Sequence, residues 1–446
     1  MKGVARKTIH SIKSKFDSES KTLFRNSSWV FSANLVGSVL GFLRSILIAR
    51  LLGVDLLGTY TVSIAFVLTT QEFMRLNVSM GLIRYGARYL QEKSHEKFIA
   101  VVKYSLFLSV ISALASIVLL VVLTLAFYRT FIPLEGLAIY IILFAIANSL
   151  SFVDAISKAI LKLFYKFKIN SVIQMIMDVI EFTFVSLTLF YFRGDLQMFM
   201  TAVIVTRFVN SIVCNLAAWG ELRPELLQWW RKGHITHIKN DRREFHQFIF
   251  GNSLSSSIKV LMNQGDVILL GQLSGVRAVG LYANAKKLAY SVLTITDPLV
   301  NAIFPQFSVL VAKKEYQKVK TMLRKLSLLT LGPAILFMAS TFFFREEIIT
   351  SLYGKEYAAA GMPFFYLMIT GIQASVFFWA LPLIQSLGLT NLRLSSYIAG
   401  VLVGGLIAWW LSPSMGPTGT AIGVLVANVF INILFIRAGI KGLREA

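Results

Sequence analysis

The sequence predicts an all-α polytopic membrane protein, in which twelve transmembrane helices form two parallel-repeat six-helix bundles around a central cavity. Three observations support this prediction. The chain has 446 residues, of which 56% are hydrophobic and only 15% charged, whereas a soluble domain carries roughly 25% charged residues. Twelve apolar stretches approach the length of about 20 residues that a membrane-spanning helix needs. Finally, a segment of the first half recurs in the second half.

The recurring segment is Leu51–Tyr60, LLGVDLLGTY, which returns 222 positions later as Leu273–Tyr282, LSGVRAVGLY. The same offset, without a gap, pairs Arg44 with Asp266. Short matches are easily made by chance in apolar sequence, but this one is long and includes glycines and a tyrosine. We therefore infer that one half is a structural copy of the other, and we expect the functional site where the two copies face each other.

The predicted spans divide equally between the halves, with six in each. They are 27–49, 58–82, 101–127, 134–157, 169–192, 196–219, 248–271, 280–304, 323–344, 360–386, 392–411 and 417–437. An even number of spans per copy makes both copies enter the membrane from the same side, as parallel repeats do. The predicted domains are a basic N-terminal segment 1–26, a bundle 27–219, a linker 220–247, a second bundle 248–438 and a tail 439–446.

Lysine and arginine residues predict the orientation of the chain in the membrane. Most of the 44 fall in both tails, in the linker and in the connections on the same side as these, and few fall on the opposite side. Cytoplasmic connections carry such an excess. We therefore expect a multi-pass protein of a bacterial or archaeal plasma (inner) membrane, with both termini in the cytoplasm. The net charge of +22 thus reflects topology and predicts no nucleic-acid partner.

Several basic residues fall inside the predicted spans, where an ionised side chain costs at least about 2.5–3.5 kcal/mol on insertion scales. They mark several depths of one possible path, and phosphate is bound by charge-assisted hydrogen bonds to Arg and Lys. We therefore predict a cationic cavity that binds an anionic head group. Its candidate residues are Arg44, Arg75, Arg207, Lys259, Lys286 and Lys287. In the alternative, each cation only neutralises an internal acid.

Acidic residues inside the spans are candidates for ion coupling. Asp266 is seven residues from Lys259, so both share a helix face, and Asp266 is also the repeat equivalent of Arg44. It is the first candidate, with Asp178 and Glu181 as rivals. Two further groups are predicted to be structural pairs because of their helical spacing. They are Glu72 with Arg75, and Asp154 with Lys158 and Lys162.

The stretches Arg44–Tyr60, RSILIARLLGVDLLGTY, and Gly265–Val292 resemble one family. They are similar to the polysaccharide exporters of the multidrug/oligosaccharidyl-lipid/polysaccharide superfamily, the O-antigen-type (Wzx-like) flippases. The resemblance implies that polyprenyl-diphosphate-linked oligosaccharide moves from the cytoplasmic to the outer leaflet by alternating access, for surface polysaccharide assembly, with a proton or another ion as a coupling partner. The family has no short signature, so the basic residues match its cavity only in type and location.

Two other functions compete with the flippase. A multidrug or organic-cation antiporter of the same superfamily would want carboxylates in the first-half cavity, yet the first predicted helix carries Arg44 and no acid. A polysaccharide polymerase or ligase would need a substantial outer domain, whereas outer connections such as 345–359 are short. The chain also lacks the G-x-x-x-x-G-K-[ST] phosphate-binding loop. We therefore expect a transporter rather than an enzyme, without a cofactor or a metal site.

Overall fold

The computed structural model describes residues 2–131 and 136–445, and within these ranges its secondary structure is helical throughout. Nine of the described helices are long and apolar enough to cross a membrane. The predicted fold class, an all-α polytopic membrane protein, is therefore confirmed. The arrangement is also consistent with twelve spans, because two of the helices contain more than one predicted span.

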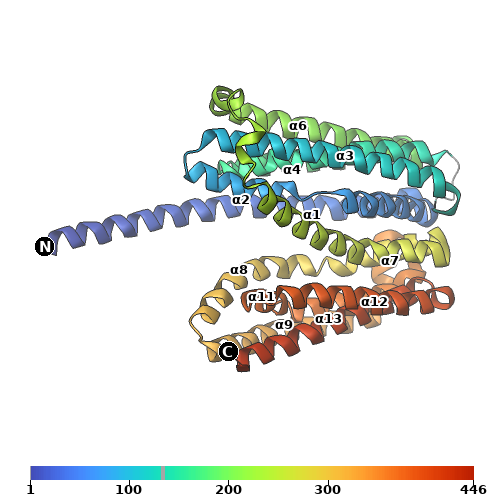
Figure 1. Ribbon diagram of the computed structural model, residues 1–446. Helices are drawn as coiled ribbons and strands as arrows, with labels where there is room; N and C mark the ends of the chain where they lie inside the picture. Colours follow the sequence, from blue (N-terminus) through green and yellow to red (C-terminus); the bar gives the residue numbers. More distant parts are fainter. Residues whose placement is uncertain (1, 132–135, 446) are drawn as a thin grey trace.

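Figure 1 shows two layers of helices that lie one above the other, with both chain termini at the same end. We call this the termini end and the other the turn end. The first lobe comprises α1 (Lys2–Met74), α2 (Val78–Gln91), α3 (His95–Phe131), α4 (Leu137–Leu163), α5 (Phe167–Tyr191) and α6 (Leu196–Trp230). After the short helix η1 (Ile235–Ile238), the second lobe comprises α7 (Arg242–Tyr290), α8 (Leu293–Ala312), α9 (Tyr316–Tyr353), η2 (Lys355–Ala360), α10 (Gly361–Val376), α11 (Ala380–Ser386), α12 (Thr390–Met415) and α13 (Pro417–Glu445).

Helices α1 and α7 each turn sharply at one glycine. Gly53 has φ 73° and ψ 176°, and Gly275 has φ 81° and ψ 174°. Glycine adopts positive φ without the steric cost that a side chain adds. The two turns have nearly the same geometry and stand at equivalent positions of the sequence repeat, as two structural copies require. At each turn, two helices that belong to different predicted spans follow directly on each other.

The two lobes meet at a reciprocal contact just beyond these turns, which we call the glycine crossing. A Cβ atom on Gly58 would lie 1.8 Å from the backbone oxygen of Val276, and one on Gly280 would lie 2.0 Å from that of Val54. Only glycine therefore allows the two backbones to approach so closely. Next to the crossing, Arg277 Nη1 donates to Asp55 Oδ2 at 2.9 Å. Exchanging the copies exchanges these partners, as expected for parallel repeats around a two-fold axis.

Three predicted spans are divided in the structure. The span predicted at 280–304 falls partly in α7, which ends at Tyr290, and partly in α8, which begins at Leu293. The span predicted at 58–82 breaks between α1 and α2. There the backbone N–H of Asn77 donates to Ser253 Oγ of α7 at 2.8 Å. The span predicted at 360–386 divides into α10 and α11, because Pro382 cannot donate a backbone hydrogen bond and its ring clashes with the preceding turn. The linker predicted at 220–247 is helical at both ends, since α6 continues to Trp230 and α7 begins at Arg242.

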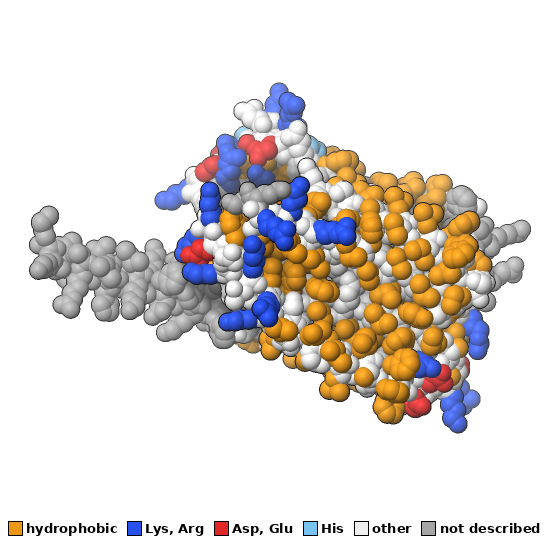
Figure 2. All heavy atoms as spheres, turned by 90° about the horizontal axis from the view of Figure 1, so that it is seen from below, with side chains coloured by type: hydrophobic (Ala, Val, Ile, Leu, Met, Phe, Trp, Pro, Cys, Tyr) orange, Lys and Arg blue, Asp and Glu red, His pale blue; other side chains and the backbone are white. Residues whose placement is uncertain are grey.

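The hydrophobic cores show where the lobes meet. One core contains Val54 and Phe199 from the first lobe together with Tyr282 and Phe364 from the second. Towards the termini end, a second core joins α2, α3 and α4 to Phe245 and Ile249 of α7, and a third lies within the second lobe. The outer surface is also apolar: Figure 2 shows hydrophobic side chains over most of one face and Lys and Arg gathered mainly near the termini end. Such a surface matches a lipid environment.

Candidate functional site

A cavity of about 440 Å³ lies between α1 and α7. Gly41 and Asn263 on its walls are each twelve residues from the turns at Gly53 and Gly275, which is about 18 Å of helix. The cavity therefore lies near the middle of a hydrocarbon layer roughly 30 Å thick, on the termini side of the glycine crossing. Its lining residues are Gly37, Ser38, Gly41, Phe42, Thr61, Asn263, Gln264, Val267, Ala283, Lys286, Lys287, Tyr290 and Ser291.

Lys286 lines this cavity and is neutralised by Asp266. Its Nζ donates to Asp266 Oδ2 at 2.6 Å and to the backbone oxygen of Asn263 at 2.7 Å. The Asp266 carboxylate also accepts from the hydroxyl of Tyr282 and from the backbone amide of Val267. The Asp266 carboxylate therefore accepts three hydrogen bonds and pairs with Lys286. It does not pair with Lys259, although the spacing of seven residues predicted that the two share a helix face.

Lys287, the next residue, bears a charge that no carboxylate neutralises within the described residues. Its Nζ donates to the backbone oxygen of Gly41 on α1 at 2.7 Å, so it bridges the two lobes. Lys259 lies on the same helix, nearer the termini end, with an exposed side chain. In the described ranges Lys259 makes no hydrogen bond and no ion pair.

A second charged cluster lies within the first lobe. Arg44 of α1 forms an ion pair with Glu181 of α5. One turn earlier on α5, Asp178 has a buried Oδ2 without a hydrogen-bond partner among the described residues. This oxygen lies 2.7 Å from the position that a Cβ atom on Gly37 would occupy. The repeat-equivalent residues Arg44 and Asp266 therefore each pair within their own lobe and not with each other.

Arg207 on α6 is held by neutral amides. Its Nη1 donates to Asn148 Oδ1 at 2.7 Å, and Asn148 Nδ2 donates to Gln71 Oε1 at 2.7 Å. Its guanidinium carbon lies 4.7 Å from the ring centroid of Phe144. No carboxylate pairs with Arg207 within 2–131 and 136–445. Eleven residues from the start of α6, or about 17 Å of helix, this arginine also lies at membrane mid-depth.

Arg75 lies apart from these groups, at the break between α1 and α2. It forms the predicted pair with Glu72, with 3.7 Å between Nη1 and Oε2, and its guanidinium carbon lies 4.8 Å from the ring centroid of Phe152. The other predicted pairing, of Asp154 with lysines at helical spacing, gives no ion pair in the described part of the chain. Asp154 instead accepts from Ser211 and Asn215 of α6, because these neutral side chains face it across the helix interface.

The structure thus brings Lys286, Lys287 and Asp266 together at the cavity, and Arg44, Glu181 and Asp178 together in the first lobe. The amide side chains that accompany the cations were not predicted as part of the site. They are Gln71, Asn148, Asn263 and Gln264. The available signal was their position within apolar spans, where an amide without a partner is costly.

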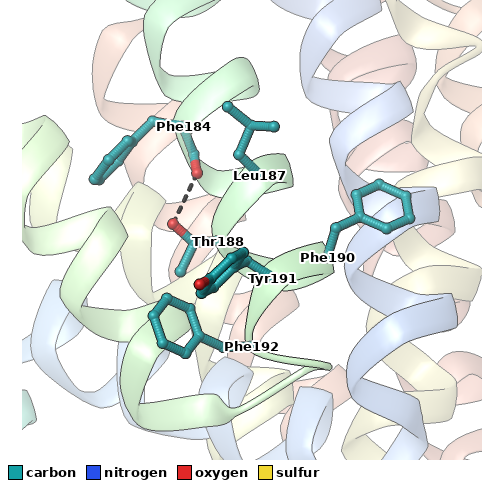
Figure 3. Close-up of a pocket in the computed structure, with 6 residues that line it drawn as sticks. All are labelled: Phe184, Leu187, Thr188, Phe190, Tyr191 and Phe192. Carbon is teal, nitrogen blue, oxygen red and sulfur yellow. Dashed lines mark hydrogen bonds between the residues drawn. The ribbon is translucent and has the colours of Figure 1, made fainter.

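A second hollow, shown in Figure 3, is apolar and lies at the turn end of α5. Phe184, Phe190, Tyr191 and Phe192 surround it, and Thr188 donates its hydroxyl to the backbone oxygen of Phe184. The Tyr191 side chain is 83% exposed. Aromatic residues gather at membrane interfaces, and no charged side chain lines this hollow, so it does not fit an anionic head group.

The fold and the charged cavity define a two-lobed helical membrane protein with a polar cavity between its lobes. Residues 23–311 match the model of a family described as polysaccharide biosynthesis protein, and the chain belongs to that family. The amylovoran biosynthesis protein AmsL of Erwinia amylovora is 24% identical over 250 residues, which cover 51% of this chain and 61% of that protein. The match thus spans less than two thirds of the length of AmsL.

Solved structures share the fold at low sequence identity. An inward-facing multidrug resistance MATE transporter has a TM-score of 0.71 at 14% identity, with 92% of this chain and 95% of that chain covered. The lipid II flippase MurJ in an inward closed conformation has a TM-score of 0.66 at 15% identity, with 93% and 89% covered. Together with the family match, these structures confirm the resemblance to Wzx-like flippases. The chain is therefore a membrane protein of a polysaccharide biosynthesis family, with the fold that these transporters share.

Proposed function

We propose that this protein is a flippase for polyprenyl-diphosphate-linked oligosaccharide repeat units. It moves them by alternating access from the cytoplasmic to the outer leaflet of a bacterial or archaeal plasma membrane, for surface polysaccharide assembly, and the termini end faces the cytoplasm. The observation that carries the proposal is a set of basic side chains at membrane depth, Arg207, Lys287 and Lys259, that no carboxylate neutralises in the described part of the chain.

These unneutralised cations need a counter-ion from outside the protein. A charge in the hydrocarbon layer is costly, whereas a diphosphate supplies several acceptor oxygens and forms short charge-assisted hydrogen bonds with Arg and Lys. The substrate of an organic-cation antiporter would be repelled by the same residues. The cations therefore support an anionic substrate, and membership of a polysaccharide biosynthesis family supports a lipid-linked sugar.

The cations also lie at successive depths, as a path across the membrane requires. Counted along the helices from the glycine turns, Arg44 is about 14 Å deep, Lys287 about 18 Å and Lys259 about 24 Å. Arg44 already forms an ion pair with Glu181, so we expect it to contribute less than Lys287 and Lys259 to binding of the diphosphate. Lys286 is neutralised in the same way, and Arg75 lies nearer the termini end, where it would meet the head group first.

For ion coupling we propose Asp178 ahead of Asp266 and Glu181. The carboxylate of Asp266 accepts three hydrogen bonds, and Glu181 is paired with Arg44. Asp178 alone of the three has a buried oxygen without a partner among the described residues. A bound proton would neutralise the charge that this buried oxygen bears without a hydrogen bond.

Reconstitution tests the proposed function directly. In proteoliposomes, the wild-type protein should move a fluorescent polyprenyl-diphosphate oligosaccharide between leaflets, and Lys287→Gln should move it about ten-fold more slowly with normal membrane insertion. Lys318→Gln removes a charge from an exposed pair with Glu315 and should leave the rate unchanged. Efflux of a cationic dye without any movement of the lipid would identify an organic-cation antiporter instead.

A further inference from the structure

The cavity between α1 and α7 carries little net charge for a diphosphate site. Lys286 is neutralised by Asp266, so only Lys287 contributes an unneutralised charge. The remaining polar groups that line it are neutral, and they include the adjacent amides of Asn263 and Gln264. A cavity of this composition fits a neutral hydroxylated molecule with at most one negative group beside it.

The side chains of Asn263 and Gln264 have no partner within the described residues. Neither Asn263 nor Gln264 forms a side-chain hydrogen bond in the described ranges, although both stand at membrane mid-depth. Each amide offers two donor hydrogens and an acceptor oxygen, and leaving such a group unsatisfied in an apolar medium is costly. Lys286 fixes the backbone of Asn263 through its bond to that residue's oxygen, so the amides are held on the cavity wall.

The opposite wall leaves room for a ligand. A Cβ atom on Gly41 would meet nothing within 4 Å, so the space in front of this glycine is empty of protein atoms. The rings of Phe42 and Tyr290 also line the cavity, and its volume of about 440 Å³ lies within the usual range for small-molecule sites of roughly 300–1,000 Å³. An apolar ring face beside amide groups suits a sugar, which has both apolar and hydroxylated faces.

We propose that this cavity is a sugar subsite, in which Asn263 and Gln264 hydrogen-bond the hydroxyl or acetamido groups of the sugar attached to the diphosphate, while Lys287 faces the adjoining phosphate. The inference rests on the proposed flippase function and adds the residues that select its glycan. The second phosphate lies outside this cavity, where the remaining cations bind it.

The test compares lipids with and without a sugar in the same proteoliposomes. The probes are a fluorescent polyprenyl diphosphate, the same lipid bearing one hexose, and the same lipid bearing one N-acetylhexosamine. Asn263→Leu and Gln264→Met keep the side-chain size and remove the hydrogen bonds. Each should slow a sugar-bearing lipid about ten-fold, as expected for one lost hydrogen bond, and leave the bare diphosphate unaffected.

Filling the cavity gives an independent measurement. Gly41→Val projects into empty space and raises helix propensity, so it should insert normally and slow the sugar-bearing lipids more than the bare lipid. Gly405→Val is the matched control, because a Cβ atom there also meets nothing within 4 Å and Gly405 belongs to α12, outside the cavity. It should slow neither lipid.

The outcomes separate this inference from the proposed function. If the wild-type protein moves neither the bare nor the sugar-bearing lipid, the flippase proposal fails. If it moves the bare lipid but neither sugar-bearing lipid, the sugar subsite is wrong. The subsite is also wrong if the amide and Gly41 variants slow bare and sugar-bearing lipids by the same factor, or slow neither.

Discussion

A single charge placed beside Arg207 tests whether this arginine binds an anion. Asn148→Asp keeps the size of the side chain and the acceptor oxygen that lies 2.7 Å from Arg207 Nη1, but adds a permanent negative charge. Two unit charges about 4 Å apart attract each other by about 4 kcal/mol at an effective dielectric constant of 20. The new carboxylate would therefore compete with a substrate phosphate for the same guanidinium.

We expect Asn148→Asp to slow flipping of the diphosphate lipid at least ten-fold while the protein remains inserted and folded. The substitution also turns a donor into an acceptor opposite Gln71 Oε1, which costs one hydrogen bond, about 1 kcal/mol. Gln71→Met is the uncharged control. It removes that hydrogen bond together with those that Gln71 Nε2 donates to the backbone oxygen of Ala145 and to Ser149 Oγ. It should therefore lose at least as much stability as Asn148→Asp, but without the loss of transport.

The assay is lipid flipping in proteoliposomes together with the melting temperature of the purified protein. If Arg207 is only structural, Asn148→Asp gives it an ion-pair partner, and transport should persist at the wild-type rate. That result would refute the assignment of Arg207 to the head group. The assignment would also fail if Gln71→Met lost as much transport as Asn148→Asp, because the lost hydrogen bond would then explain both.

Three further predictions follow from other contacts. Gly58→Val forces apart the backbones at the glycine crossing and should destabilise the protein by about 1–3 kcal/mol, as overpacking does, seen as a lower melting temperature. Arg44→Ala should reduce the amount of inserted protein, because it leaves the Glu181 carboxylate without its partner, and Arg44→Ala with Glu181→Ala should restore that amount. If Arg44→Ala alone inserts as well as the wild type, the pair is not needed for stability. Reporter fusions after Lys97 and Lys239 should both report the cytoplasm. A periplasmic signal at either position would contradict the proposed topology.

The sequence was informative about the fold because the bilayer restricts the possible structures. Long apolar stretches must be helical in lipid, so their number and length predicted the fold class, and the repeat around Gly53 and Gly275 predicted two equivalent turns. The breaks after Met74 and Val376 were not predictable from apolar length. They depend on tertiary partners and local backbone constraints, such as the hydroxyl of Ser253 and the ring of Pro382.

The candidate site was predictable in kind but not in its pairings. Charged residues stand out in an apolar chain, so Arg44, Lys286 and Asp266 could be found by inspection. Which carboxylate pairs with which cation depends on how helices far apart in sequence face each other, and helical spacing alone suggested the wrong partner for Asp266. The same limit applies to Asn148, whose role beside Arg207 depends on the packing of α4 against α6.

The ion pair between Asp55 and Arg277 bears on the history of the chain. The two residues are equivalent positions of the repeat and meet beside the axis that relates the halves. In a symmetric dimer of identical subunits, a position next to the two-fold axis meets its own copy, so two like charges would face each other there. Opposite charges at this point require that the two copies have diverged in sequence. The pair therefore favours the contact between a first half and a second half. A contact between two first halves would instead bring two Asp55 carboxylates together.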